Sequence, residues 1–348
     1  MKQIQKTIAQ FLFSKTDHWL EAFNASGTSL PARNLADYFS NTENISINNN
    51  DTKSVKKRKR KHATLQNDIS CVYDVKFKNC YGENCSVKSH TWGAVPHHTA
   101  ETTKHVIIFW GGGTSTEGML SEIANFRKHT NLVVHTFNYP LINDNTGSIY
   151  SHDDLVTCSK AIINNLIEGD MKIKPQNTIF YGDCYGAAVA ESVYQSYKDD
   201  DKIYFAGRVL SNTFTKFTSA AHRMIFCNIR GMLFTDPTTA VSFLVTAAIY
   251  ALLSPILVFA HLFFMLLPLF GWETSPLKTA NQQNDDLWIT NRNQDTVLGS
   301  AKLADNLPQV GNSPSDWKSI NSKLSISASP ERRKRFSNQS PILLIYQT

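Results

Sequence analysis

Short apolar segments alternate with amphipathic ones from residue 69 onward, and this alternation constrains the fold more than any other feature of the sequence. Helical patterns occupy 115–129, 151–168 and 183–197, and strand patterns occupy 105–110, 131–140, 177–182, 202–212 and 286–293. Strand–helix–strand repeats of this length build a mostly parallel sheet with helices on both faces. Two earlier strands, 69–77 and 85–95, are predicted to be antiparallel neighbours. The predicted fold class is therefore α/β.

Composition excludes several other classes of protein. Of the 348 residues, 42% are hydrophobic and 18% are charged, which excludes an intrinsically disordered chain. Six cysteines in 348 residues are too few for a disulfide scaffold, and because they contain no CxxC pair we expect no structural zinc site. No cofactor is predicted. Six of the 35 Lys and Arg are consecutive at 56–61, and the remaining 29 are matched by 29 Asp and Glu. The body of the protein is therefore not expected to bind nucleic acid.

The N-terminal part divides into two predicted units. Residues 1–30 contain an amphipathic helix over 4–23, which either packs on the main domain or contacts a membrane surface. Lys6 and Gln10 interrupt its apolar run, so no secretory signal is predicted and a reducing cytosol is expected. Residues 31–66 are Asn-rich and then basic, as in a solvated linker. The run at 56–61 has the composition of a nuclear-localisation signal, and it equally suits an anionic membrane or plain solvent. The main domain is predicted at 67–330, with a tail at 331–348.

The segment YGDCYGAA places Gly182, Cys184 and Gly186 between a predicted strand and a predicted helix. This G-x-C-x-G spacing is that of a nucleophile elbow with cysteine in place of the usual serine. A sharp turn pushes the nucleophile out above the sheet, and the two glycines allow neighbouring backbone to pass close by. The helix N-terminus favours an anion there and supplies thiolate. The alternative is a buried core cysteine in a tight turn.

Two further motifs complete the candidate site. A glycine run at 111–113 follows a strand, where Gly112 and Gly113 could supply one backbone donor of an oxyanion hole. The second donor would be the N–H of Tyr185, directly after the nucleophile. Asp295 follows the last predicted strand, where the acid of a catalytic triad is expected. The alternatives are a glycine turn that requires positive φ, and an Asp that caps a helix or turn.

Segments 105–113, 177–190 and 286–304 together resemble an α/β-hydrolase over about residues 69–330. The GxCxG form resembles the dienelactone-hydrolase type, and the order of motifs is similar to that of lipase-like hydrolases of intracellular bacteria. The resemblance implies Cys184 as nucleophile, Gly112, Gly113 and Tyr185 as oxyanion hole, and Asp295 as acid. No metal is implied.

One feature departs from that family: the catalytic histidine should follow the acid, but the last histidine in the chain is His261. Three explanations compete. The protein is inactive, its C-terminus is altered, or another histidine is recruited, namely His152, His222 or the pair His97–His98. A thiolate tolerates the loss better than a serine, because it needs no base in order to attack.

Residues 237–272 carry no charge, and Ser254–Pro255 divides them into pieces of about 14 and about 16 apolar residues, each short of a membrane span. A single crossing would separate Cys184 from Asp295, so we predict an apolar helical lid or hairpin that returns to its own side. The alternative is a buried helical cap. The sequence thus predicts a membrane-associated hydrolase on the cytoplasmic side that acts on lipid-like or small acyl esters or thioesters, with 237–272 and 4–23 as membrane contacts. The alternatives are an inactive α/β-hydrolase-fold binding protein and an integral membrane protein with a soluble domain on each face.

Overall fold

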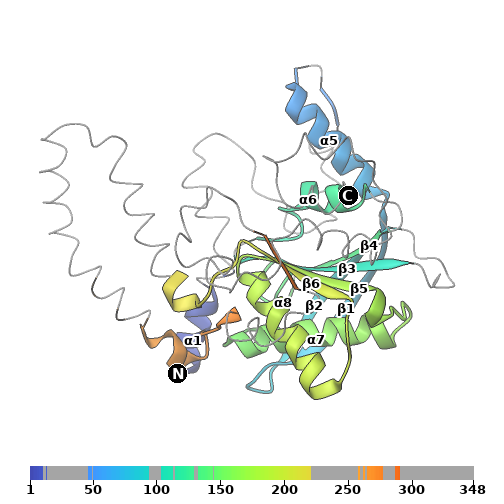
Figure 1. Cartoon of the computed structure of the whole chain (residues 1–348). Coiled ribbons are helices and arrows are strands. Elements are labelled where there is room, and N and C mark those ends of the chain that lie inside the picture. Colours follow the sequence, from blue (N-terminus) through green and yellow to red (C-terminus); the bar gives the residue numbers. More distant parts are fainter. Residues whose placement is uncertain are drawn as a thin grey trace, which may run out of the picture.

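One seven-stranded sheet organises the molecule (Figure 1). The computed structural model describes residues 1–10, 13, 46–48, 50–93, 103–112, 114–128, 132–143, 145–220, 258, 262, 265–276 and 287–290. The strand order is β1-β2-β4-β3-β5-β6-β7. The strands are β1 (Ile69–Lys78), β2 (Asn84–Trp92), β3 (Lys104–Phe109), β4 (Leu132–Phe137), β5 (Thr178–Asp183), β6 (Gly207–Ser211) and β7 (Leu287–Thr290).

The direction of the strands agrees with the sequence prediction. β1 pairs with β2, and β2 with β4, in antiparallel register, whereas all pairs from β4 to β7 are parallel. β4 is buried at every position, and β3 is buried at all but its first. Continuous apolar runs of this kind arise because helices cover both faces of a parallel sheet. The predicted α/β class and mostly parallel sheet are confirmed.

Two hydrophobic layers cover the sheet. Helices α1 (Lys2–Ala9), α7 (His152–Glu168) and α8 (Tyr185–Ser196) lie on one face, and α5 (Lys53–Gln66) and α6 (Leu120–Phe126) on the other (Figure 1). Alternate residues of β3 point into different layers: Ile107 and Phe109 pack with the first set of helices, and Val106 and Ile108 with the second. This alternation follows from the two-residue period of a strand.

Three short helical turns complete the described structure: η2 (Pro175–Asn177), η3 (Tyr197–Asp201) and η4 (Leu267–Phe270). The predicted helix 151–168 is confirmed as α7, which Ser151 caps by accepting a hydrogen bond from the N–H of Asp154 at 3.3 Å. Several elements are shorter than predicted, such as β4, which ends at Phe137. β6 begins only at Gly207, and α6 begins only at Leu120, because residues 116–119 form turns in front of it.

The prediction of a solvated linker over 31–66 requires correction in its second half, where residues 53–66 form α5. Lys and Arg are good helix formers, and Thr52 caps the helix by accepting from Val55 N at 3.4 Å. Leu65 is buried, and Lys61 Nζ donates to Asn125 Oδ1 of α6 at 3.0 Å. The helix carries only a narrow apolar stripe, so periodicity alone did not reveal it. Residues 31–45 lie outside the described residues, as does the tail 331–348.

The amphipathic N-terminal helix packs on the main domain over its described part. Ile8, Ala9 and Phe13 are buried in the same layer as α7 and α8. Gln5 donates to Phe270 O at 3.0 Å and accepts from the Tyr81 hydroxyl at 2.7 Å. Residues 14–23 of the predicted helix lie outside the described residues.

Only the end of the apolar segment 237–272 is described. Leu267 and Trp272 are buried in the layer that contains α1. The predicted lid or hairpin lies outside the described residues at 237–257. Within the described ranges, no helix combines the length and the apolar character that crossing a membrane requires.

A buried ion pair joins α8 to β6. Arg208 and Glu191 are both fully buried, and Arg208 Nε and Nη2 donate to the two carboxylate oxygens of Glu191, the latter at 3.2 Å. The guanidinium also lies over the ring of Tyr194, 4.2 Å from its centroid. A charge that loses its partner in such a place is costly.

We expect Glu191→Ala to lower the free energy of unfolding by about 3–5 kcal/mol, because it leaves the Arg208 guanidinium buried without its carboxylate. Urea unfolding measures the change. The matched control is Asp201→Ala, which breaks the partly exposed pair with Lys160 (2.8 Å) and should cost no more than about 1 kcal/mol. Equal effects of the two substitutions would show that the buried pair is not a special constraint on α8.

Candidate active site

Cys184 stands at the turn between β5 and α8, where the structure forces an unusual backbone. Its φ is 53° and its ψ is −119°, a conformation that L-residues other than glycine rarely adopt. Its N–H donates to Ser211 O of the neighbouring strand β6 at 2.9 Å, which fixes the turn to the sheet. Strain held in this way is characteristic of functional sites. The side chain is partly exposed, so the alternative of a buried core cysteine does not hold.

The two glycines of the G-x-C-x-G motif are required by close approach. A Cβ on Gly182 would lie 2.7 Å from Ala187 N, and one on Gly186 would collide with the carbonyl oxygens of Phe109 and Trp110. The first residues of α8 therefore press directly against the ends of β5 and β3. This contact brings the loop that follows β3 next to the thiol.

The glycine run after β3 meets the turn at its first residue. A Cβ on Gly111 would lie 3.0 Å from Cys184 Cβ, so this loop runs immediately beside the nucleophile position. Gly112 is exposed, and Gly113 lies outside the described residues. α8 begins at Tyr185, so the Tyr185 N–H belongs to the first turn, whose N–H groups lack acceptors within the helix. The structure thus brings Cys184, Gly111 and the Tyr185 backbone together at the carboxyl ends of the interior strands β3 and β5, and Gly112 is the next residue of that loop.

The side chain of Tyr185 points into the core rather than to the surface. It is buried among Phe13, Phe214 and Phe217, with ring centroids 4.8–6.0 Å away. Burial raises the pKa of its hydroxyl well above the ordinary value. Only the backbone of Tyr185 can therefore face a substrate.

His152, a candidate for a recruited base, is a core residue. Its Nδ1 lies 3.2 Å from the Tyr185 hydroxyl and its Nε2 lies 2.9 Å from Ser192 Oγ, so both ring nitrogens have partners. Burial lowers its pKa to about 4. The idea that His152 serves Cys184 is therefore wrong. The other candidates, His222, His97 and His98, lie outside the described residues, as does the predicted acid Asp295.

A polar network that the sequence did not reveal holds the loop after β3. The buried Trp110 donates to Thr116 Oγ1 at 3.1 Å, and Thr116 N donates to Asn138 Oδ1 at 2.8 Å. Asn138 also donates to buried Glu117 at 3.0 Å, and Asn143 donates to the same carboxylate at 2.6 Å. These hydrogen bonds thereby join the loops that follow β3 and β4. The only sequence signal was polar residues directly after apolar strands.

A second polar pair flanks the turn at the end of β6. Asn212 has a φ of 49°, and its side-chain amide donates to Asp183 Oδ1 at 3.0 Å. Asp183 therefore has a fixed partner next to the nucleophile position. Among the described residues, no group of three His, Cys, Asp or Glu is arranged to hold a metal ion.

Known proteins are similar to this chain in structure but not detectably in sequence. No protein-family model matches it, and no curated protein matches it. An esterase of Pyrococcus furiosus is 16% identical over 65% of this chain and 72% of its own, with a TM-score of 0.43. An α/β hydrolase of Vibrio vulnificus is 17% identical over 64% of this chain and 69% of its own, with a TM-score of 0.35.

A third solved structure, carboxyl esterase 2 of the fungus Tuber melanosporum, is 15% identical over 58% of each chain, with a TM-score of 0.35. In other solved esterases the match is shorter, down to 48% of the solved chain. The chain is thus distantly similar in structure to esterases of the α/β-hydrolase type.

Proposed function

We propose that the protein is a membrane-associated hydrolase of ester or thioester bonds that uses Cys184 as its nucleophile. One observation carries the proposal: Cys184 occupies a strained turn at the carboxyl end of β5, directly in front of a helix N-terminus and beside a glycine loop. A thiol has no structural reason to be in a left-handed conformation, which glycine would adopt at lower cost. The position presents sulfur to a substrate.

The chemistry that fits this geometry is acyl transfer through a thioester. The Cys184 thiolate attacks the acyl carbonyl carbon, and the carbonyl electron pair moves to oxygen. Backbone N–H groups of Tyr185 and of the loop at Gly112 and Gly113 would hold that oxyanion. Collapse expels the alcohol or thiol of the substrate, which takes up a proton. Water then cleaves the thioester, which releases the acid and restores the thiol, with Asp295 as the proposed acid of the site.

The decisive experiment is to trap the acyl group on the protein. After brief exposure to a p-nitrophenyl acyl ester and acid quenching, mass spectrometry of peptides should find the acyl mass on Cys184. Cys80 provides an internal control: the residue is exposed, but partial burial of its thiol and the Asp154 carboxylate, to which its Sγ donates at 3.4 Å, raise the thiol pKa to about 11. Acylation at Cys184 alone supports the proposal. Acylation spread over both cysteines, or absent from both, would contradict it.

A second candidate function is a binding protein that has kept the fold without the chemistry. It is favoured by His152, which is bound to Tyr185 and Ser192 rather than available to the thiol. Such a protein would bind a lipid-like acyl ester without turning it over. In the trapping experiment it would show no acyl mass, while equilibrium binding of an uncleavable ether analogue would persist.

The enzyme acts at the cytoplasmic side of a membrane, where lipid-like esters are found. The apolar segment that ends at Trp272 supports this location. A role for residues 56–61 in nuclear targeting is the weaker alternative, since these residues are part of the folded helix α5.

A further inference from the structure

Large apolar side chains are exposed among the described residues that precede Trp272. They are 43–70% exposed, and they are Val258, Leu262, Met265, Leu266 and Leu269. Val258, Leu262, Met265 and Leu269 follow one another at intervals of three or four residues, which is the repeat of one helix face, and Leu266 is the neighbour of Met265. The opposite side is fixed to the protein, because Leu267 and Trp272 are buried in the core. An apolar stripe held outward in this way needs a partner to cover it.

Helix α1 adds to the same surface. Met1 and Ile4 are 76% and 45% exposed, and the next residue, Gln5, donates to Phe270 O at 3.0 Å. Two segments more than 250 residues apart in the chain therefore lie side by side, as the violet α1 and the orange segment in Figure 1 show. We call the seven exposed apolar residues the docking face: Met1, Ile4, Val258, Leu262, Met265, Leu266 and Leu269.

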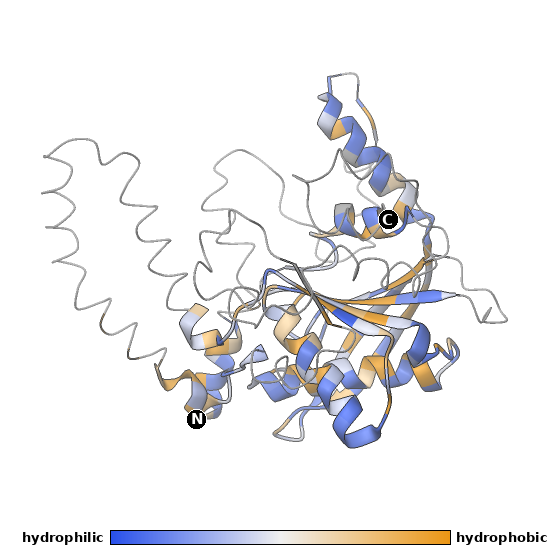
Figure 2. Ribbon diagram, in the orientation of Figure 1, coloured by the Kyte–Doolittle hydropathy of each residue, from blue (hydrophilic) through white to orange (hydrophobic). Residues whose placement is uncertain are grey.

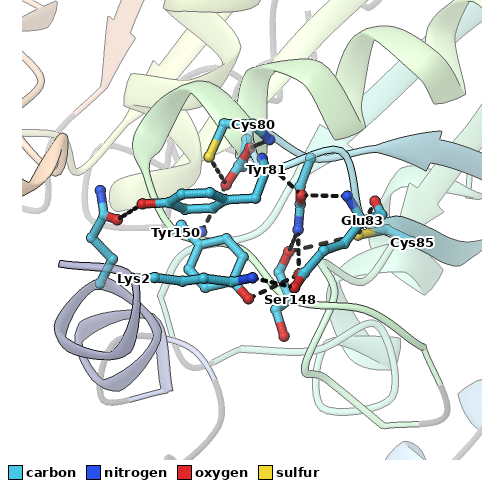
Figure 3. A network of polar contacts seen from close by, with 10 residues as sticks. Lys2, Cys80, Tyr81, Glu83, Cys85, Ser148 and Tyr150 are labelled. Carbon is cyan, nitrogen blue, oxygen red and sulfur yellow. Dashed lines mark hydrogen bonds and ion pairs between the residues drawn. The ribbon is translucent and has the colours of Figure 1, made fainter.

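A polar network holds α1 in position behind the docking face. Lys2 Nζ lies 2.8 Å from Glu83 Oε1, and the Tyr150 hydroxyl donates to the other oxygen of Glu83 at 2.8 Å (Figure 3). The Tyr81 hydroxyl donates to Gln5 Oε1 at 2.7 Å. Lys2 and Gln5 thus tie α1 to the protein, while Ile8 and Ala9 of the same helix are buried in the core. Met1 and Ile4 are the apolar residues of α1 that stay exposed.

The charges around the docking face indicate what covers it. Residues 1–16 contain no Asp or Glu, and no charged residue stands between Asp236 and Glu273. α1 carries Lys6, and also Lys2, whose ammonium pairs with Glu83 at 2.8 Å. Lysines are therefore the only charged side chains within the two segments, and segments that combine apolar residues with lysines suit a bilayer surface that contains anionic lipid. A protein partner would instead be expected to meet polar rim groups, at about one hydrogen bond per 100–200 Å².

The basic helix α5 cannot contact the same flat membrane at the same time. It lies on the opposite face of the sheet from α1, at the far end of the molecule (Figure 1). Figure 2 shows α5 as largely hydrophilic. Of these two surfaces, the docking face is the better membrane contact, because it offers apolar side chains and the burial of apolar area supplies most of the free energy of interfacial binding.

We infer that the docking face binds a membrane surface containing anionic lipid, with the exposed residues of α1 and those that precede Trp272 lying in the interface together. The inference deepens the membrane part of the proposed function, and it holds whether or not Cys184 is catalytic. The docking face binds peripherally, through side chains that insert between lipids while the sheet stays in water.

Flotation with vesicles of phosphatidylcholine and phosphatidylserine tests the inference on the full chain without substrate. Leu262→Glu and Leu269→Glu should each lower the vesicle-bound fraction by about tenfold or more, because each replaces an exposed leucine that would insert between the lipids with a charge. Ile4→Glu should act in the same direction, which shows that α1 belongs to the face. The matched control is Val72→Glu, at a residue of β1 that is equally exposed (51%) but stands elsewhere. It should leave binding unchanged.

The flotation results decide whether the docking face binds the membrane. Equal loss for all four variants, or no binding by the unmodified chain, overturns the inference. If Leu269→Glu instead converts a lipid-free dimer into a monomer on gel filtration, the face is an interface between two copies and the inference is also overturned. Hydrolysis of a water-soluble ester, measured without vesicles, stays unchanged in Leu269→Glu. Failure of docking is thereby distinguished from failure of the catalytic proposal.

Discussion

Cys184→Ala is expected to abolish the hydrolysis of p-nitrophenyl esters, with kcat/KM falling by about 10³-fold or more. The substitution removes only Sγ, which in the proposed mechanism forms the bond to the acyl carbon. Losses of this size are typical when the nucleophile of an acyl-transfer enzyme is deleted. Steady-state rates of purified wild-type and variant protein measure the effect, and acyl chains of several lengths extend the assay to the substrate class.

Stability separates the loss of a nucleophile from the loss of the fold. Alanine keeps a Cβ at the strained backbone position, so we expect the unfolding midpoint of Cys184→Ala to stay near that of the wild type. Cys80→Ala, which removes an exposed thiol elsewhere, should keep full activity. Residual hydrolysis in Cys184→Ala equal to that of the wild type would refute the proposed nucleophile.

The fold was largely predictable, because its central strands are buried on both faces and so appear as uninterrupted apolar runs. HVIIF at 105–109 and the alternation with helices were sufficient to predict a parallel sheet. α5 was not predictable from periodicity, since its stability rests on capping by Thr52 and on contacts with α6 that are distant in sequence. Tertiary contacts therefore determine that α5 forms, at a place where the sequence shows no helical periodicity.

The candidate site was predictable where chemistry is local in sequence. The spacing of Gly182, Cys184 and Gly186 encodes a turn, because each glycine meets backbone that a Cβ would strike. The network of Glu117 and Asn138 was not predictable, because it depends on which strand ends meet across the sheet. The position of His152 was equally unpredictable, because nothing in its neighbours along the chain showed that its ring would be buried between Tyr185 and Ser192.

A second unpredicted feature is a pair of histidines buried inside the sheet. His105 Nδ1 of β3 lies 3.1 Å from His135 Nε2 of β4, and His135 Nδ1 lies 3.0 Å from Thr91 Oγ1 of β2. The rings are stacked, with centroids 5.3 Å apart. Burial lowers the pKa of His105 to about 4 and that of His135 well below its ordinary value. Both rings are therefore neutral at neutral pH, and each shares one hydrogen bond with the other.

These histidines, together with His152, should make the protein sensitive to mild acid. A histidine of the unfolded chain binds a proton near pH ~6.5, whereas folded His105 and His152 do so only near pH 4. Between these values the unfolded state holds more protons, so stability is fully present above pH ~6.5 and is lost as pH falls toward 4. The cost approaches about 3 kcal/mol for each of the two.

Urea unfolding at a series of pH values measures this loss, and the variants assign it. The free energy of unfolding should fall steeply from about pH 6.5 to about pH 4.5. Glu83 titrates below this window, because hydrogen bonds from Lys2, Asn79 and Tyr150 lower its pKa to about 2. His152→Gln retains an amide that can meet Tyr185 and Ser192 but cannot take up a proton, so its slope against pH should be smaller by up to one proton, about 1.4 kcal/mol per pH unit. A stability that stays level across this window in the wild type would show that the buried rings are protonated in the folded state.

The loss of stability also bears on catalysis, because His152 supports Tyr185, whose backbone N–H is the proposed oxyanion donor. Ester hydrolysis should therefore decline over the same pH range as the fold, and the decline should be shallower in His152→Gln.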